Sequence, residues 1–266
     1  GGGVSNAQPL TITITGTNDP VDAVNNSYTF NEDSGNNALN ILANDVDLDS
    51  DPITLTSIAG IAWSSGSSLT KTFTGQGVLS VSSTGSVSFT PDSNFAGSLS
   101  FDYTVTDGQG TSDSATVNLT VSPINDQPVL TTSGLIATAS ENSANSTATA
   151  LWSTAPVYSV GGGADESSQT IQSYKITNIP TFITLFKSDG TSAVSSGSTV
   201  TAAEFAALKY KTVENANGSG EIRFDVIDSG SGTAPNDNTL ENQSVSITIT
   251  AVNNAPLATG SATLSS

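Results

Sequence analysis

The stretch "FTPDSNFAGSLSFDYTVTDG" (89–108) is the strongest indication of the fold. It recurs as "YKTVENANGSGEIRFDVIDS" (210–229) at a constant offset of 121 residues. The match places Asp107 against Asp228, each at the end of a run in which apolar and polar residues alternate. Alternation with a period of two is typical of a strand that is buried on one face. A long internal match of this kind predicts two copies of one β-rich unit.

Three further stretches mark the ends of such units. Each consists of an alternating strand, then Asn-Asp or Asn-Asn, then proline, and they read "LTITITGTNDP" (10–20), "VNLTVSPINDQP" (117–128) and "VSITITAVNNAP" (245–256). Their first asparagines, Asn18, Asn125 and Asn253, are 107 and 128 residues apart, and each interval has the size of one domain. We therefore expect a domain at 20–126, a larger one at 127–256, the last strand of a preceding repeat at 1–19 and the start of a following repeat at 257–266.

The secondary structure is expected to be mostly strand. Alternating runs recur every 8–12 residues between turn residues, for example at 53–58, 77–83, 86–90, 100–106 and 115–121. About seven short strands per unit predict an antiparallel β-sandwich. One stretch differs: "TAAEFAAL" (201–208) places Glu204 three residues after Thr201, which is the capping box of a helix start, so we expect one or two helical turns there.

The composition limits which partners and metal ions the chain can bind. The chain of 266 residues has 24 acidic and six basic residues and a net charge of −18. A surface this acidic repels nucleic acid and anionic membranes. The chain has no histidine, cysteine or methionine, so a bound metal needs oxygen ligands, which are typical of calcium or magnesium. No apolar run is long enough to span a membrane. The N-terminal "GGGVSNAQPL" does not resemble a signal peptide, and we expect the chain to be a piece of a longer protein.

An acidic loop, "NDVDLDSDP" (44–52), carries four aspartates at alternate positions: Asp45, Asp47, Asp49 and Asp51. An EF-hand is excluded, because loop position 6 is Ser50 rather than glycine and position 12 is Thr56 rather than glutamate. A solvated acidic loop remains an alternative, since neighbouring charges would repel by only about 0.7 kcal/mol in water. The other interpretation is that the loop binds Ca²⁺ together with Asp107 and the Asn18-Asp19 pair of the linker.

The motifs resemble those of cadherin-like tandem repeats in large bacterial RTX-type surface adhesins. The resemblance is carried by the strand followed by Asn-Asp-x-Pro, the early Glu32 in "FNEDSGN", the Asp-x-Asp loop and the "VTDG" turn. It covers residues 10–126 closely and 127–256 more loosely. It implies an all-β fold of tandem antiparallel β-sandwiches, of the cadherin and immunoglobulin type, with calcium at the junctions between domains.

Carried over residue by residue, the resemblance implies three groups of Ca²⁺ ligands. The first group is Asn18, Asp19, Asp45, Asp47 and Asp107, with Asp49 and Asp51 beside them. The second is Glu32, Asn125, Asp126, Asp165, Glu166 and Asp228. The third is Glu141, Asn253 and Asn254. The linkers carry Gly16, Pro123 and Ala251 where the family has a first aspartate, and the second unit offers only two acids in "GGGADESSQ" (161–169), so we expect calcium binding to decrease from the first group to the third.

The function that follows from this resemblance is mechanical and adhesive. We expect a monomeric extracellular segment, stiffened by Ca²⁺, whose partners are the neighbouring repeats of the same chain. The alternative is that the second unit itself binds a peptide or a sugar on a host or partner cell, because it carries the insertions and five of the six basic residues. An enzyme is not expected. Asp102 and Asp225 lie on polar strand positions, and Trp63 and Trp152 have the apolar neighbours of core residues rather than of sugar-stacking platforms.

Overall fold

The computed structural model describes residues 2, 9–13, 16–136, 138–143 and 146–253, and it divides the chain into two compact units, 1–123 and 124–266. Each unit is described on its own. Residues 9–13 and 16–19 contain no strand. The predicted repeat start at 257–266 and the candidate ligand Asn254 lie outside the described residues. No helix in the described part is long and apolar enough to cross a membrane.

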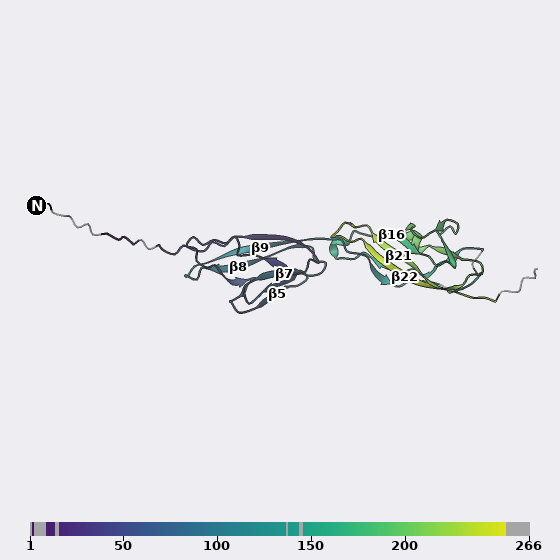
Figure 1. Ribbon diagram of the computed structural model, residues 1–266, viewed down its shortest axis with the longest axis horizontal. Coiled ribbons are helices and arrows are strands. Elements are labelled where there is room, and N and C mark those ends of the chain that lie inside the picture. Colours follow the sequence, from purple (N-terminus) through teal and green to yellow (C-terminus); the bar gives the residue numbers. More distant parts are fainter. Residues whose placement is uncertain (1, 3–8, 14–15, 137, 144–145, 254–266) are drawn as a thin grey trace, which may run out of the picture. The chain divides into compact units, whose positions relative to one another are not determined.

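The first unit is a sandwich of two sheets (Figure 1). The five-stranded sheet has the order β1-β9-β8-β3-β4 and the four-stranded sheet the order β2-β7-β6-β5. Every pair is antiparallel except β1 with β9, which run parallel. The strands are β1 (Asn26–Asn31), β2 (Asn37–Leu39), β3 (Thr54–Ile58), β4 (Ile61–Ala62), β5 (Leu69–Phe73), β6 (Gly77–Val81), β7 (Val87–Pro91), β8 (Gly97–Thr106) and β9 (Ser112–Ser122).

Alternation of side chains builds the first core. In β6 and β7 every second residue is buried, and the two strands pair from Gly77↔Pro91 to Val81↔Val87 across a turn at residues 83–84. Leu79 and Phe89 are fully buried between the sheets, as is Tyr103 of β8. The predicted all-β sandwich is therefore confirmed.

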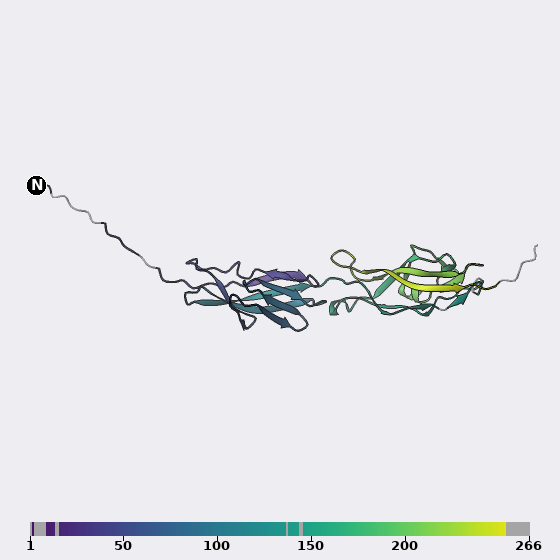
Figure 2. The same cartoon turned by 60° about the horizontal axis from the view of Figure 1, so that its bottom comes forward.

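The second unit also has one five-stranded and one four-stranded sheet, with the orders β12-β22-β21-β16-β19 and β13-β20-β17-β18. Two additional two-stranded sheets pair β10 with β15 and β11 with β14. Figure 2 shows the long strand β22 in yellow. The strands are β10 (Val129–Thr132), β11 (Leu135–Ile136), β12 (Ala139–Ser140), β13 (Thr149–Ala150), β14 (Trp152–Thr154), β15 (Val157–Ser159), β16 (Ile171–Asn178), β17 (Ile183–Phe186), β18 (Ala193–Val194), β19 (Thr199–Thr201), β20 (Lys209–Thr212), β21 (Gly218–Asp228) and β22 (Thr239–Thr250).

The number of strands exceeds the predicted seven per unit. The described residues form nine strands in the first unit and thirteen in the second. Many are only two or three residues long, such as β4 and β11, and such short pairings leave too few alternating positions to stand out in a sequence. Sheet edges, rather than the central strands, account for the difference.

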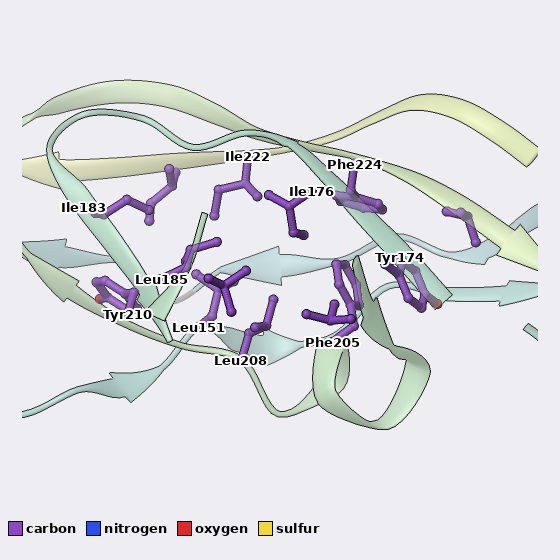
Figure 3. Close-up of a cluster of buried hydrophobic side chains, with 14 of the residues drawn as sticks. Leu151, Tyr174, Ile176, Ile183, Leu185, Phe205, Leu208, Tyr210, Ile222 and Phe224 are labelled. Atoms are coloured by element: carbon purple, nitrogen blue, oxygen red, sulfur yellow. The ribbon is translucent and has the colours of Figure 1, made fainter. Parts of the chain in front are cut away.

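The predicted helix is confirmed as α1 (Ala202–Ala206). The Thr201 side chain accepts a hydrogen bond from the Glu204 backbone N–H at 3.2 Å, and Glu204 Oε2 accepts one from the Thr201 N–H at 2.9 Å. These reciprocal bonds satisfy two donors at the start of the helix. The helix points Phe205 into the second core, where Figure 3 shows it next to Tyr174 and Phe224.

Candidate functional site

The first unit gathers oxygen atoms at the start of its sandwich. We call this group the first cluster, and it consists of Asn18, Asp19, Asp47, Asp49, Asp51 and Asp107. Asp107 directly follows β8, and three of the aspartates lie in the loop between β2 and β3. The linker is tied to both segments, because Asn18 Nδ2 donates to Asp107 Oδ2 at 2.8 Å and the Asp19 N–H donates to Asp49 Oδ2 at 2.6 Å.

The carboxylate of Asp107 is fully used by protein donors. Its Oδ1 accepts from the N–H groups of Gln109 and Thr111 at 2.8 and 3.2 Å, and its Oδ2 accepts from the Thr111 hydroxyl and from Asn18. These bonds, the Thr111 hydroxyl first, hold the pKa of Asp107 well below its usual range. Asp107 is therefore an anion that the protein itself stabilises.

The acidic loop retains charge repulsion. Burial, followed by the charges of Asp47, Asp49 and Asp107, raises the pKa of Asp51. Asp47 Oδ1 accepts from the N–H groups of Asp49 and Asp51 at 3.0 and 3.1 Å, whereas its Oδ2 is buried and accepts no hydrogen bond. The loop is ordered around Asp47 but holds several like charges in a small space.

Asp45 has a different environment from the other three loop aspartates. Its Oδ1 lies 2.7 Å from the hydroxyl of Tyr103 and accepts from the Val24 N–H at 2.8 Å, while its Oδ2 is buried and accepts no hydrogen bond. Asn26 Nδ2 donates to the same hydroxyl at 3.2 Å. One oxygen of Asp45 thus anchors the loop to the core.

The second unit gathers oxygens in an equivalent position. We call this group the second cluster, and it consists of Asn125, Asp126, Glu166, Gln169 and Asp228. Asp228 ends β21 as Asp107 follows β8, and Glu166 ends the short 3₁₀ turn η1 (Ala164–Glu166). Asp126 N–H donates to Glu166 Oε1 at 2.6 Å, and Gly230 N–H donates to Asp228 Oδ1 at 2.7 Å.

Four oxygens of the second cluster are buried and accept no hydrogen bond. They are Asn125 Oδ1, Glu166 Oε2, Gln169 Oε1 and Asp228 Oδ2. Glu166 and Asp228 are 1% and 0% exposed, and burial raises the pKa of both carboxyls. The ion pairs in the described ranges, Lys187–Glu204 and Arg223–Glu221, do not reach this cluster. Ionised carboxylates that are buried without a positive partner are costly, and a bound cation would offset that cost.

Two glycines leave room for the second cluster. A Cβ on Gly230 would lie 1.7 Å from Asn125 Oδ1 and 2.6 Å from Gln169 Oε1. A Cβ on Gly162, whose φ is +63°, would lie 2.3 Å from Glu166 Oε2. These oxygens therefore lie directly against the glycine backbone, where any side chain on Gly230 or Gly162 would collide with them. They fit an oxygen-coordinated ion such as Ca²⁺, which takes carboxylate and amide oxygens as ligands.

The remaining predicted ligands are placed as follows. Glu32 is buried at the end of the first unit's β1, and its N–H donates to Ser122 O at 2.9 Å. Glu141 is buried in the second unit, where Oε1 accepts from the Val252 N–H at 3.0 Å and Oε2 from Asn217 Nδ2 at 2.7 Å. Asp165 and Asn253 are exposed.

Carboxylates alone do not form a metal site. In the described part of the chain, no three acidic side chains are grouped so that they could hold a metal ion. Gln169 belongs to the cluster but is not an acid, so a search for carboxylates does not find it, although it lies within the stretch "GGGADESSQ" (161–169). The same stretch carries Gly161 and Gly162 next to the cluster, which is a signal that could have drawn attention to it.

The two tryptophans have structural roles. Trp63 is 9% exposed, and its indole N–H donates to Ser67 O at 2.8 Å. Trp152 is half-buried and donates to Phe205 O at 2.7 Å. Each belongs to the core of its own unit, as the apolar neighbours in the sequence predict, and each unit carries one tryptophan.

Comparisons with known proteins support the fold of the first unit. Residues 18–120 match the family described as Bacterial Ig domain. The match assigns an immunoglobulin-like β-sandwich to that unit. No curated protein sequence matches the chain.

Solved structures give weaker likenesses. The chain is similar to protocadherin gamma B2 extracellular cadherin domains 3–6, with 11% identity over 86% of this chain and 46% of that chain and a TM-score of 0.41. Human CDH23 EC21–23 shares 14% identity over 89% of this chain and 70% of that one, with a TM-score of 0.37. The endo-fucoidan hydrolase MfFcnA4 shares 16% identity over 87% of this chain and 29% of that one, with a TM-score of 0.29. TM-scores this low carry no argument about fold or function.

Proposed function

We propose that the chain is a calcium-binding extender segment of a bacterial surface adhesin. Its sandwiches would present an adhesive module away from the cell, and Ca²⁺ would stiffen the segment at the domain junctions. A bound Ca²⁺ supplies positive charge and six to eight coordination positions for oxygen. The resemblance to RTX-type adhesin repeats and the bacterial immunoglobulin-like match of residues 18–120 support an extracellular location.

One observation carries the proposal. Glu166 and Asp228 are buried, each keeps an oxygen that accepts no hydrogen bond, and the ion pairs described above do not neutralise them. Natural proteins bury carboxylates when these are paired or bind a metal. Glu166 Oε2 and Asp228 Oδ2 therefore have lone pairs that accept no hydrogen bond from the described residues and could coordinate a metal ion.

Thermal unfolding of the full chain with calcium and with a chelator tests the binding. Trp152 reports on the second unit in a Trp63→Phe background, and Trp63 reports on the first in a Trp152→Phe background. Calcium at 100 times its dissociation constant should add about 2.7 kcal/mol to the free energy of unfolding. Asp228→Asn and Glu166→Gln should remove most of the gain of the second unit.

Glu214→Gln is the matched control, since Glu214 is an exposed acid of the same unit. It removes one negative charge without touching the second cluster. Equal melting temperatures in calcium and chelator for both reporters would end the calcium proposal. Small-angle scattering tests the extender role separately: a distance distribution that calcium leaves unchanged would rule out stiffening.

The alternative, ligand binding by the second unit, is favoured by a specific surface. Lys209 and Lys211 lie on the face of β20 opposite to the buried Tyr210 and Thr212, and Lys211 Nζ lies 5.3 Å from the centre of the Phe186 ring. The two lysine charges would attract an anionic sugar. A glycan array with the full chain in calcium should then show binding that Lys209→Glu with Lys211→Glu abolishes, and an array with no signal would reject sugar binding, whereas a peptide screen tests the peptide.

A further inference from the structure

The loop Ser229–Asn238 distinguishes the second unit from the first. It joins β21 to β22, whereas the corresponding connection from β8 to β9 covers only 107–111. Asn236 and Asp237 of this loop hold the linker residue Asn125 on both sides. Asn125 N–H donates to Asn236 Oδ1 at 2.8 Å, and Asp237 N–H donates to Asn125 O at 2.7 Å.

This loop also orients the Asn125 amide. Asn125 Nδ2 donates to the backbone carbonyl of Asp237 at 2.9 Å. A carbonyl oxygen only accepts hydrogen bonds, so this contact fixes which end of the amide is nitrogen. Asn125 Oδ1 consequently packs against Gly230, at the place that a Cβ would take, where it is buried and accepts no hydrogen bond.

Gln169 approaches the same glycine from another segment. Its backbone N–H donates to Glu166 O at 2.8 Å, which ties it to the end of η1. Its Oε1 is buried without a hydrogen bond, and a single Cβ built on Gly230 would collide with both this atom, at 2.6 Å, and Asn125 Oδ1, at 1.7 Å, so the two oxygens lie close together. Asp228 adjoins the same glycine, because its Oδ1 accepts from Gly230 N–H at 2.7 Å.

The first cluster lacks this arrangement. Asn18 uses its Nδ2 on Asp107 Oδ2 at 2.8 Å, and both oxygens of Asp107 already accept hydrogen bonds. The acidic loop then adds three aspartates, whose charges exceed what one divalent ion neutralises. The second cluster has fewer acids, namely Asp126, Glu166 and Asp228, and the amide oxygens of Asn125 and Gln169 extend its ligand set without adding repulsion.

We propose that Gln169 is a Ca²⁺ ligand of the second unit and that the loop Ser229–Asn238 is a positioning element that presents Asn125 Oδ1 as another. The inference rests on the proposed calcium-binding function and adds an amide ligand and a clamp to it. It also reverses the order of affinities expected from counting acids, since the second cluster then binds Ca²⁺ more tightly than the first.

The test is calcium titration of the full chain by calorimetry, with melting followed through Trp152 in the Trp63→Phe background. Gln169→Ala should weaken binding at the second unit by about tenfold or more, and Asn236→Ala should do so by about tenfold through the loss of positioning. Gln169→Glu should keep binding while lowering the melting temperature of the metal-free form, because it adds a charge beside Glu166 and Asp228.

Controls separate the possible outcomes. Gln172→Ala and Gln172→Glu change an exposed glutamine on β16 and should leave the titration unchanged. If Asp228→Asn abolishes binding while Gln169→Ala binds like the wild type, the Gln169 assignment is wrong and the proposed function stands. If the wild type takes up no calcium, the proposed function itself fails. A Gln169→Glu variant that loses calcium binding would contradict the ligand role, because glutamate keeps both the shape of the side chain and the acceptor oxygen.

Discussion

Positions 103 and 224 correspond in the two units, yet they carry tyrosine in the first and phenylalanine in the second. The Tyr103 hydroxyl lies 2.7 Å from Asp45 Oδ1, so it fastens the acidic loop to the core, and burial raises its pKa well above the usual range. Phe224 instead packs edge-on against Phe205, with ring centres 4.8 Å apart. The same backbone position therefore anchors a loop in one unit and completes an aromatic core in the other.

The two units also differ in the acid that follows or ends the corresponding long strand, which is Asp107 after β8 and Asp228 at the end of β21. Asp107 is stabilised as an anion by protein donors, whereas Asp228 keeps one oxygen without a hydrogen bond and has a raised pKa. The first unit satisfies Asp107 with protein donors, although Asp45 Oδ2 and Asp47 Oδ2 in its acidic loop accept no hydrogen bond. In the second unit the acid at the strand end, Asp228, itself keeps such an oxygen, which is the physical basis of the calcium site proposed there.

The largest expected effect comes from the aromatic core of the second unit. Phe205 is 1% exposed, and its ring stacks on Tyr174 with centres 3.8 Å apart. Phe205→Ala should lower the free energy of unfolding of the second unit by about 3–5 kcal/mol, because it leaves a cavity among large rings. Urea unfolding followed through Trp152 measures the change.

The first unit provides the internal control for this variant. Its transition, followed through Trp63, should not move, because Phe205 packs only within the second core. If the unfolding transition detected by Trp63 shifted by the same amount, the two units would unfold together. That result would contradict the treatment of the two units as independent.

A smaller loss of stability is expected when the Tyr103 hydroxyl, which the corresponding Phe224 of the second unit lacks, is removed. Tyr103→Phe removes the group that meets Asp45 and should lower the stability of the first unit by about 1–3 kcal/mol, because buried polar partners lose a hydrogen bond. Chemical unfolding followed through Trp63 measures this change. Tyr28→Phe, on the half-buried Tyr28 of β1, leaves the network around Tyr103 intact and serves as the control.

The reciprocal substitution, Phe224→Tyr, tests whether a hydroxyl at this position also stabilises the second unit. Phe224→Tyr adds a hydroxyl to a ring that packs edge-on against Tyr158, Tyr174 and Phe205. It should not stabilise the second unit. A Tyr103→Phe variant as stable as the wild type, or a gain in Phe224→Tyr, would contradict the loop-anchoring role.

The smallest expected effect concerns the capping box of α1, an element found only in the second unit among the described residues. Thr201→Ala removes the acceptor of the Glu204 N–H and should cost about 1 kcal/mol. Thr199→Ala, at an exposed position on β19, should change stability by less than about 0.5 kcal/mol. Trp152-detected unfolding compares the two, and equal stabilities would show that the cap contributes nothing.

Much of the fold could be predicted because it depends on local patterns. Alternating residues gave the central strands such as β6 to β9, and a four-residue motif gave α1. The candidate site was only partly predictable. The acids Glu166 and Asp228 were expected as ligands from a resemblance, whereas Gln169 was not, because glutamine has no sequence pattern that marks it as a ligand.

The sequence by itself determined the two β-rich repeats, the oxygen-only chemistry and the loops in which the acids lie, since periodicity, composition and short motifs act over a few residues. Only the tertiary structure decided which oxygens remain without hydrogen bonds. Asn125 meets Asp237 across 112 residues and Tyr103 meets Asp45 across 58, and such pairs form only when distant strands have already packed. Hydrogen bonds between distant segments therefore distinguish two units that the sequence presents as copies of one another.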